Sequence, residues 1–117
     1  GRLSTHVLDT MHGRPAGGLR IDLAAISPDG ARREIGRFET NADGRTQAPL
    51  LSGDDLQPGT YELTFHLGDY FRGLAVDLPG PAFLDIVPVR FGVADAGGHY
   101  HVPLLASPWS YATYRGS

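Results

Sequence analysis

A sequence of 117 residues is long enough for one domain, residues 1–117, built around a single hydrophobic core. The formal net charge of -3 and the lack of basic runs argue against nucleic acid or a membrane as partner, because both bind clustered positive charge. The chain contains neither cysteine nor lysine, which excludes disulfides, thiolate catalysis and Schiff-base or PLP-lysine chemistry.

The first half of the chain predicts three strands separated by glycine and proline breakers. Leu3 to Asp9 forms the first strand, and Leu19 to Ile26 pairs with Arg32 to Thr40 as a hairpin. The turn Asn41-Ala42-Asp43-Gly44 contains residues that tolerate positive φ, and it presents Arg45 at a loop-to-strand junction.

The second half predicts four more strands and one short helical turn. Thr60 to Leu67 alternates most clearly, and Ile86 to Val93 is its expected partner. Asp69 to Leu74 is expected to form a helical turn, which is too short to be stable without tertiary packing. His99 to Ala106 and Tyr111 to Arg115 are the last two strands. The whole pattern is typical of an all-β antiparallel sandwich or barrel.

Alternation in these strands gathers reactive side chains on one face. If the first, penultimate and last strands share a sheet, His6, His101 and Tyr114 lie on its outer face, and Thr113 and Arg115 lie on the opposite one. The outer face also carries four apolar residues, Leu8, Pro103, Leu105 and Ala112. Such a face is too apolar to face water, so we expect a second copy of the chain to cover it.

Several motifs follow one another in a familiar order from residue 3 to residue 117. They are Leu3-Ser4-Thr5-His6-Val7-Leu8-Asp9, Asp43-Gly44-Arg45, Gly59-Thr60-Tyr61-Glu62-Leu63-Thr64-Phe65, Gly68-Asp69-Tyr70-Phe71, His99-Tyr100-His101-Val102-Pro103-Leu104-Leu105 and the terminal Tyr114-Arg115-Gly116-Ser117. In this order and spacing the chain resembles the 5-hydroxyisourate hydrolases, the transthyretin-like enzymes of purine catabolism. Only Ala106 and Trp109-Ser110 depart from the family pattern, and they affect the shape of a turn.

The resemblance implies a transthyretin-like antiparallel β-sandwich of two four-stranded sheets with one short helical turn. It implies a homotetramer, a dimer of dimers, with active sites in a central channel and no cofactor. The reaction implied is hydrolysis of 5-hydroxyisourate to 2-oxo-4-hydroxy-4-carboxy-5-ureidoimidazoline, a step of urate degradation in which water attacks a cyclic amide carbonyl.

Site residues carry over from the family motifs. They comprise His6, Arg45 and His101 as catalytic residues, and His6, Arg45, Tyr114, Arg115 and Ser117 as substrate-binding residues. The two histidines share the general-base and orienting roles, in an order that the sequence leaves open. Arg45 is expected to pair with carbonyl oxygens of the small-molecule substrate, Tyr114 to bond its ring, and Ser117 to orient a histidine or water.

Other interpretations compete with this one. The main alternative is a transthyretin-like carrier or interaction module that binds a small ligand in the same channel without converting it; another is a domain of a larger purine-pathway protein. A zinc site is disfavoured because His99 and His101 lack a third ligand at a suitable spacing. His12 and His66 are expected at the surface.

The expected location is cytoplasmic. No apolar run approaches the roughly 20 residues that span a bilayer, and the first residues lack the regions of a signal peptide. The sequence begins with Gly1, so a peroxisomal location stays open if a targeting segment precedes it.

Overall fold

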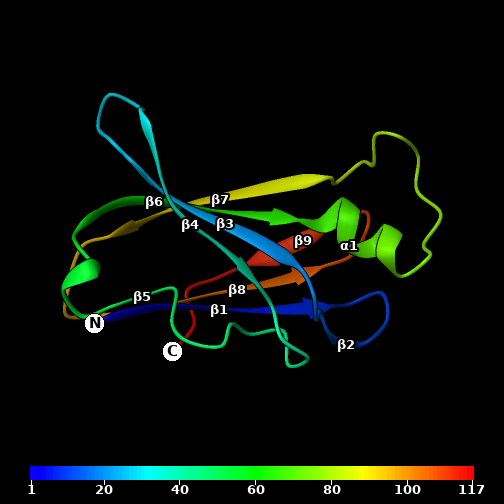
Figure 1. Cartoon of the computed structure of the whole chain (residues 1–117), viewed down its shortest axis with the longest axis horizontal. Coiled ribbons are helices and arrows are strands. Elements are labelled where there is room, and N and C mark those ends of the chain that lie inside the picture. The colour runs from blue at the N-terminus through cyan, green and yellow to red at the C-terminus, as the bar shows by residue number, and fades with distance from the viewer.

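Alternating apolar and polar residues build two β-sheets that pack face to face in the computed structural model, which describes residues 1–117 (Figure 1). One sheet has the order β4-β3-β6-β7, formed by β4 (Arg32–Glu39), β3 (Arg20–Ile26), β6 (Gly59–His66) and β7 (Ile86–Val93). The other has the order β2-β1-β8-β9, with β5 also paired to β1; its strands are β2 (Arg14–Pro15), β1 (Arg2–Asp9), β8 (His99–Ala106), β9 (Tyr111–Thr113) and β5 (Leu51–Ser52). The predicted transthyretin-like sandwich is confirmed.

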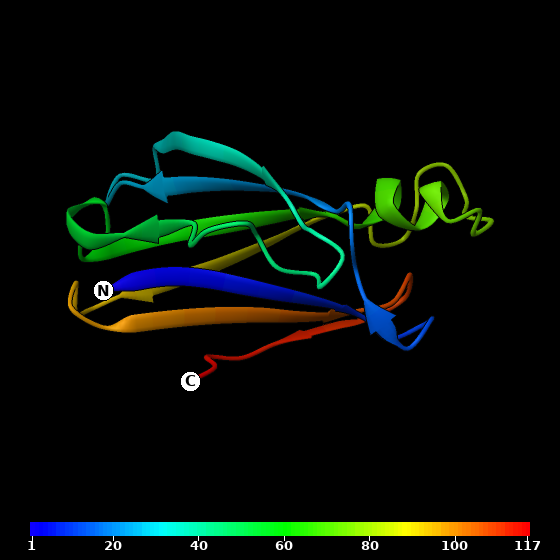
Figure 2. The ribbon, with the colours of Figure 1, turned by 60° about the horizontal axis from the view of Figure 1, so that its bottom comes forward.

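Figure 2 shows these two layers edge-on, with β3, β4 and β6 in one and β1, β8 and β9 in the other. A single hydrophobic core of 22 buried residues fills the space between them. Leu3, Thr5 and Val7 of β1 and Tyr100 of β8 point into the core region, as the alternation predicted. Their outward neighbours are therefore free to form a site.

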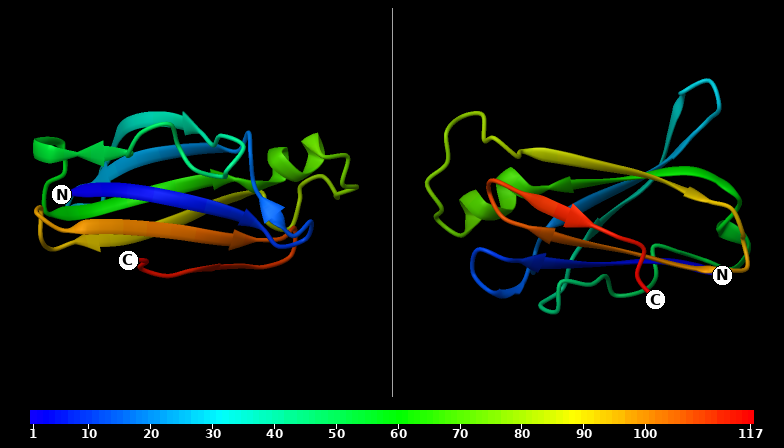
Figure 3. Two further views of the ribbon diagram at one scale, coloured as in Figure 1. Left: turned by 90° about the horizontal axis from the view of Figure 1, so that it is seen from below. Right: turned by 180° about the vertical axis from the view of Figure 1, so that it is seen from behind.

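The only α-helix, α1 (Leu67–Gly73), follows β6 directly, and a 3-10 turn, η1 (Gly53–Asp55), precedes β6. Leu67, Tyr70 and Phe71 of α1 are buried, so tertiary packing holds this short helix, as expected. The helix projects beyond the sandwich at the end where β1 finishes, and both chain termini lie toward the other end (Figure 3). The structure has no helix with the length and apolar character that a membrane crossing requires.

The structure differs from the prediction in four details. The short strands β2 and β5 were not predicted, because two residues carry no periodicity. β1 and β8 pair in parallel, an exception in an otherwise antiparallel fold. The last strand ends at Thr113 and not at Arg115, although Gly116 forms a further bridge to β8. Arg45 lies within a long loop, and no strand begins after it until β5.

Candidate functional site

Rows of side chains cross the outer face of the β1-β8-β9 sheet. The parallel register of β1 and β8 sets Ser4 opposite His101 and His6 opposite Pro103. Gly116 forms a bridge to His101 on the other side of β8, which extends the first row into the C-terminal segment. The last row is apolar and consists of Leu8, Leu105 and Ala112. The outer face predicted for His6 and His101 is thus observed.

His101 is half-buried in the first of these rows. Its Nδ1 lies 2.8 Å from the Ser4 hydroxyl, and no protein group hydrogen bonds Nε2. Gly116 passes close to the ring, since a Cβ added there would lie 2.6 Å from Cδ2 of His101. Burial lowers the pKa of His101, and the positive charges of Arg45 and His6 lower it further. The ring is therefore biased toward its neutral form.

The turn after β4 is anchored against β1 by backbone and side-chain hydrogen bonds. The amide of Val7 donates to Gly44 O over 2.8 Å. Gly44 has a φ of 74°, and a side chain there would collide with the Val7 carbonyl, so this close approach requires glycine. Asn41 Oδ1 accepts hydrogen bonds from the amides of Asp43 and Arg45, at 2.9 and 3.2 Å. The turn thereby fixes Arg45 beside β1.

His6 is held by this turn in a different way from His101. Its Nε2–H donates to the carbonyl oxygen of Asp43 over 2.9 Å. A carbonyl only accepts, so the proton resides on Nε2 and the lone pair of neutral His6 on Nδ1. Backbone geometry therefore assigns the tautomer of His6.

A cavity of about 250 Å³ opens beside these groups. It is lined by Arg2, Ser4, Thr5, Arg45, Thr46, Gln47, Ala48 and Pro49. Two guanidinium groups and several hydroxyl and amide groups make it polar and positively charged, which suits a ligand rich in carbonyl oxygens. The cavity is large enough to admit a small ring compound.

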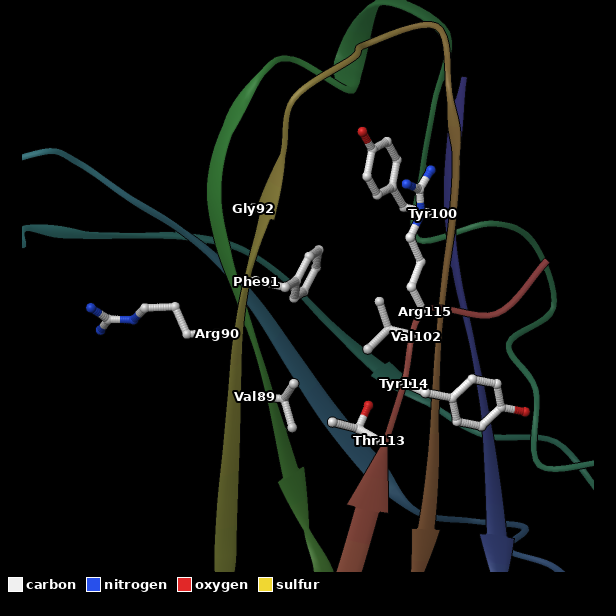
Figure 4. A pocket seen from close by; sticks show the side chains of 9 residues that line it. All are labelled: Val89, Arg90, Phe91, Gly92, Tyr100, Val102, Thr113, Tyr114 and Arg115. Carbon is white, nitrogen blue, oxygen red and sulfur yellow. The ribbon is translucent and has the colours of Figure 1, made fainter.

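The C-terminal segment divides the predicted site residues between two faces. Tyr114 is 60% exposed and borders a second cavity of about 240 Å³ between β7 and β9, although its ring points away from the other lining side chains in Figure 4. Arg115 lines that second cavity, with its guanidinium 4.2 Å from the centre of the Tyr100 ring. Arg115 also donates to His99 O over 3.3 Å. Its side chain thus lies on the inner side of the strand, away from the face that carries His101.

Two histidines that were expected at the surface each have a carboxylate partner. His12 Nδ1 lies 2.6 Å from Oδ2 of Asp9, whose side chain is fully buried and also accepts a 2.8 Å hydrogen bond from the Tyr70 hydroxyl. His66 is only 11% exposed and bonds Asp22 over 2.9 Å. His12 is exposed as predicted, although the buried carboxylate of Asp9 holds its ring. The surface prediction is wrong for His66, which lies against the half-buried carboxylate of Asp22; sequence spacing reveals neither partner.

The pKa values of the Asp9 and Asp22 carboxyl groups both lie below the ordinary aspartate value. Burial alone would raise the pKa of Asp9, but hydrogen bonds from His12 and Tyr70 outweigh it and lower that pKa. Burial and Asp9 together raise the pKa of Tyr70 to about 12.

No group of three or more histidine, cysteine, aspartate or glutamate side chains is placed to hold a metal ion.

Ser4, Asn41 and Gly44 are site residues that were not singled out from the sequence. Ser4 matters only because of the β1–β8 register, which no local pattern reveals. Asn41 and Gly44 belong to a turn that was predicted, but the sequence did not indicate that it would close onto β1.

Comparison with known proteins agrees with the fold and with the motif order. Residues 3–116 match the HIUase/Transthyretin family. The protein named 5-hydroxyisourate hydrolase 2 of Rhizobium meliloti is 62% identical over 117 residues, which make up 100% of this chain and 97% of that protein.

Two solved structures are similar along the whole chain. A 5-hydroxyisourate hydrolase of Klebsiella pneumoniae has a TM-score of 0.82 at 31% identity, with 100% of this chain and 99% of that chain covered. An (S)-allantoin synthase has a TM-score of 0.93 at 48% identity, with 100% of this chain covered. This chain spans only 44% of the synthase chain.

Proposed function

Because this chain belongs to the HIUase/Transthyretin family, we propose that it hydrolyses 5-hydroxyisourate with His101 as the general base that activates water. Identity of 62% over the whole chain to a 5-hydroxyisourate hydrolase supports the activity, and makes the chain an enzyme of urate degradation. The observation that carries the choice of base is the unpartnered Nε2 of His101 in a half-buried, cationic setting.

The difference between the two histidines supports this assignment. A general base needs a lone pair within reach of the water whose proton it takes. Nε2 of His6 is protonated and held by Asp43 O, so its lone pair is confined to Nδ1, whereas Nε2 of His101 has no protein partner. The lowered pKa of His101 favours the neutral form of its ring, which is the form that can take a proton. His6 accordingly serves to orient the substrate and the turn.

The proposed chemistry needs a single proton relay. Nε2 of His101 takes a proton from water while the water oxygen forms a bond to the cyclic amide carbonyl carbon. The C–N bond then breaks, and the same proton moves from Nε2 to the leaving nitrogen, which opens the ring to a carboxylic acid. A positioned base of this kind contributes about 10²–10⁴-fold to the rate.

Arg45 supplies the electrostatic half of the mechanism. Its forked donors suit the carbonyl oxygens of the substrate and the negative charge that develops on one of them. Arg45 lines the 250 Å³ cavity together with Ser4, which contacts Nδ1 of His101, and the charge of Arg45 lowers the pKa of His101, so base and cation lie near each other. Tyr114 and Ser117 remain predicted substrate contacts, and Arg115 is proposed to act through the backbone of His99.

We also propose a homotetramer in which this face lines a channel. The apolar row Leu8, Leu105 and Ala112 lies beside the histidines, and Trp109 and Tyr111 are 59% and 45% exposed nearby in sequence. Burying them against another copy would remove apolar surface from water. Light scattering coupled to gel filtration measures the mass directly, and a monomer at working concentration would contradict this part of the proposal.

The test of function is hydrolysis of freshly generated 5-hydroxyisourate, followed by its ultraviolet absorbance. The protein is expected to accelerate the decay far above the spontaneous rate in matched buffer, and a chelator is expected to leave the acceleration unchanged. Binding without any acceleration would overturn the enzymatic proposal and favour a carrier.

A further inference from the structure

Ser4 is the one side chain that hydrogen bonds the ring of His101. The two residues are 97 positions apart in the sequence, and they meet because β1 and β8 pair in parallel with Ser4 opposite His101. The Oγ–Nδ1 distance of 2.8 Å is typical of a good hydrogen bond. The contact is part-buried, so water competes with it less than at an open surface.

The partner of Nδ1 decides which nitrogen of a neutral imidazole carries the lone pair. If Nδ1 is protonated, Nε2 is a base; if Nδ1 is bare, Nε2 holds the proton and accepts none. A serine hydroxyl can either donate or accept, so distance alone leaves both arrangements open. Hydrolysis with His101 as base requires the arrangement in which Ser4 accepts.

The rest of the ring is restrained by the C-terminal segment. The amide of Gly116 donates to His101 O over 2.7 Å, and its backbone runs against the Cδ2 side of the ring. Ser4 therefore holds the Nδ1 edge and Gly116 borders the Cδ2 edge. Rotation of the ring by half a turn would break the Ser4 contact and bring Cδ2 to the Nδ1 position.

We propose that Ser4 is a positioning residue, whose Oγ accepts the Nδ1–H of His101 and so fixes Nε2 as the nitrogen that takes the proton from water. The inference rests on the proposed function for its kinetic consequence only. The tautomer itself is a property of the free protein, and it can be observed without substrate.

Three variants separate this role from a structural one. Ser4→Ala removes the acceptor with little change in shape, and Ser4→Thr keeps a hydroxyl at a strand position that suits a β-branched residue. Ser52→Ala is the matched control, because Ser52 is exposed on β5, beside β1, and its hydroxyl makes no hydrogen bond.

The first readout is ¹⁵N NMR of the histidine rings in the free protein, with the His101 signals assigned by their loss in His101→Gln. We expect wild type, Ser4→Thr and Ser52→Ala to show the Nδ1–H tautomer of His101. Ser4→Ala should shift the ring toward Nε2–H, because nothing then selects a proton on Nδ1. An Nε2–H tautomer in wild type, or an unchanged tautomer in Ser4→Ala, would overturn the proposal.

The second readout is steady-state hydrolysis of 5-hydroxyisourate. Loss of one such hydrogen bond is expected to lower kcat of Ser4→Ala roughly tenfold, with KM nearly constant, while Ser4→Thr recovers most of the loss. A kcat in Ser4→Ala equal to that of Ser52→Ala would contradict the positioning role. If wild type fails to accelerate hydrolysis, the proposed function fails, but the NMR result still decides the tautomer. Should Ser4→Ala not fold, the wild-type and Ser4→Thr spectra decide it.

Discussion

His101 and His12 both have Nδ1 engaged by an oxygen of β1, yet the two rings are surrounded very differently. The partner of His101 is the neutral hydroxyl of Ser4, with Arg45 and His6 near enough to lower its pKa. The partner of His12 is the buried carboxylate of Asp9, which also accepts from Tyr70 in α1. A cationic setting with an open nitrogen suits proton transfer, whereas a buried carboxylate with several donors suits anchoring.

The contrast extends to what each cluster connects. The Asp9 cluster ties the end of β1 to α1, and His12 stacks on Phe71 with ring centres 6.3 Å apart. The His101 cluster instead joins β1, β8 and the C-terminal segment around an open face. A histidine's function therefore follows from the whole set of groups around it, and a single hydrogen bond does not decide it.

The largest expected effect separates the two histidines by activity. His101→Ala should lower the rate of 5-hydroxyisourate hydrolysis at least about a hundredfold, because it removes the proposed base. His12→Ala, the matched control, should change the rate less than about twofold, since His12 makes its contacts to the Asp9 cluster. Steady-state kinetics on folded protein, checked by circular dichroism, measures both. Equal losses of activity in His101→Ala and His12→Ala would contradict the proposal that His101 is the base and His12 is not involved in catalysis.

The Asp9 and His101 clusters should also differ in how much they contribute to the free energy of unfolding, although this effect is smaller. Asp9→Ala should lower the free energy of unfolding by about 3 kcal/mol, because it strands the buried Tyr70 hydroxyl and frees His12. Tyr70→Phe removes a single hydrogen bond to the carboxylate and should cost about 1.5 kcal/mol. Urea unfolding at one protein concentration gives both values. A His101→Ala variant that loses as much stability as Asp9→Ala would show that the His101 cluster also anchors the fold.

The contribution of Asp9 to the free energy of unfolding should depend on pH, and it should decrease in acid. The pKa of Asp9 is lower in the folded chain than in the unfolded one, so its contribution is complete above an unfolded value of about 3.9. It is lost as pH falls through the lowered folded value. The stability gap between wild type and Asp9→Ala should therefore close in that acid range.

Much of the fold could be predicted, because period-2 alternation is a local property. Alternation placed Leu3, Thr5 and Val7 inward, and it predicted the pairing of β6 with β7. It also put Arg115 on the face opposite Tyr114, where the structure has it. The family resemblance, which groups both residues with the site, carries no information about which face each occupies.

The rest could not be predicted, because it depends on contacts between distant segments. The parallel direction and register of β1 and β8 bring Ser4 to His101 across 97 residues. The carbonyl of Asp43 reaches His6 only after the turn closes onto β1. Asp9 and Tyr70 likewise meet only once α1 packs on the end of β1. Sequence spacing encodes none of these distances, although each of them decides a protonation state or a tautomer.

The pH dependence of kcat/KM for 5-hydroxyisourate tests the central claim, that His101 is the base, most directly. Because burial, Arg45 and His6 lower the pKa of His101, activity should fall on the acid side with a midpoint below the ordinary histidine value of about 6.5. That acid limb should be absent from the residual activity of His101→Gln. A midpoint at or above about 6.5, or the same limb in His101→Gln, would contradict the account.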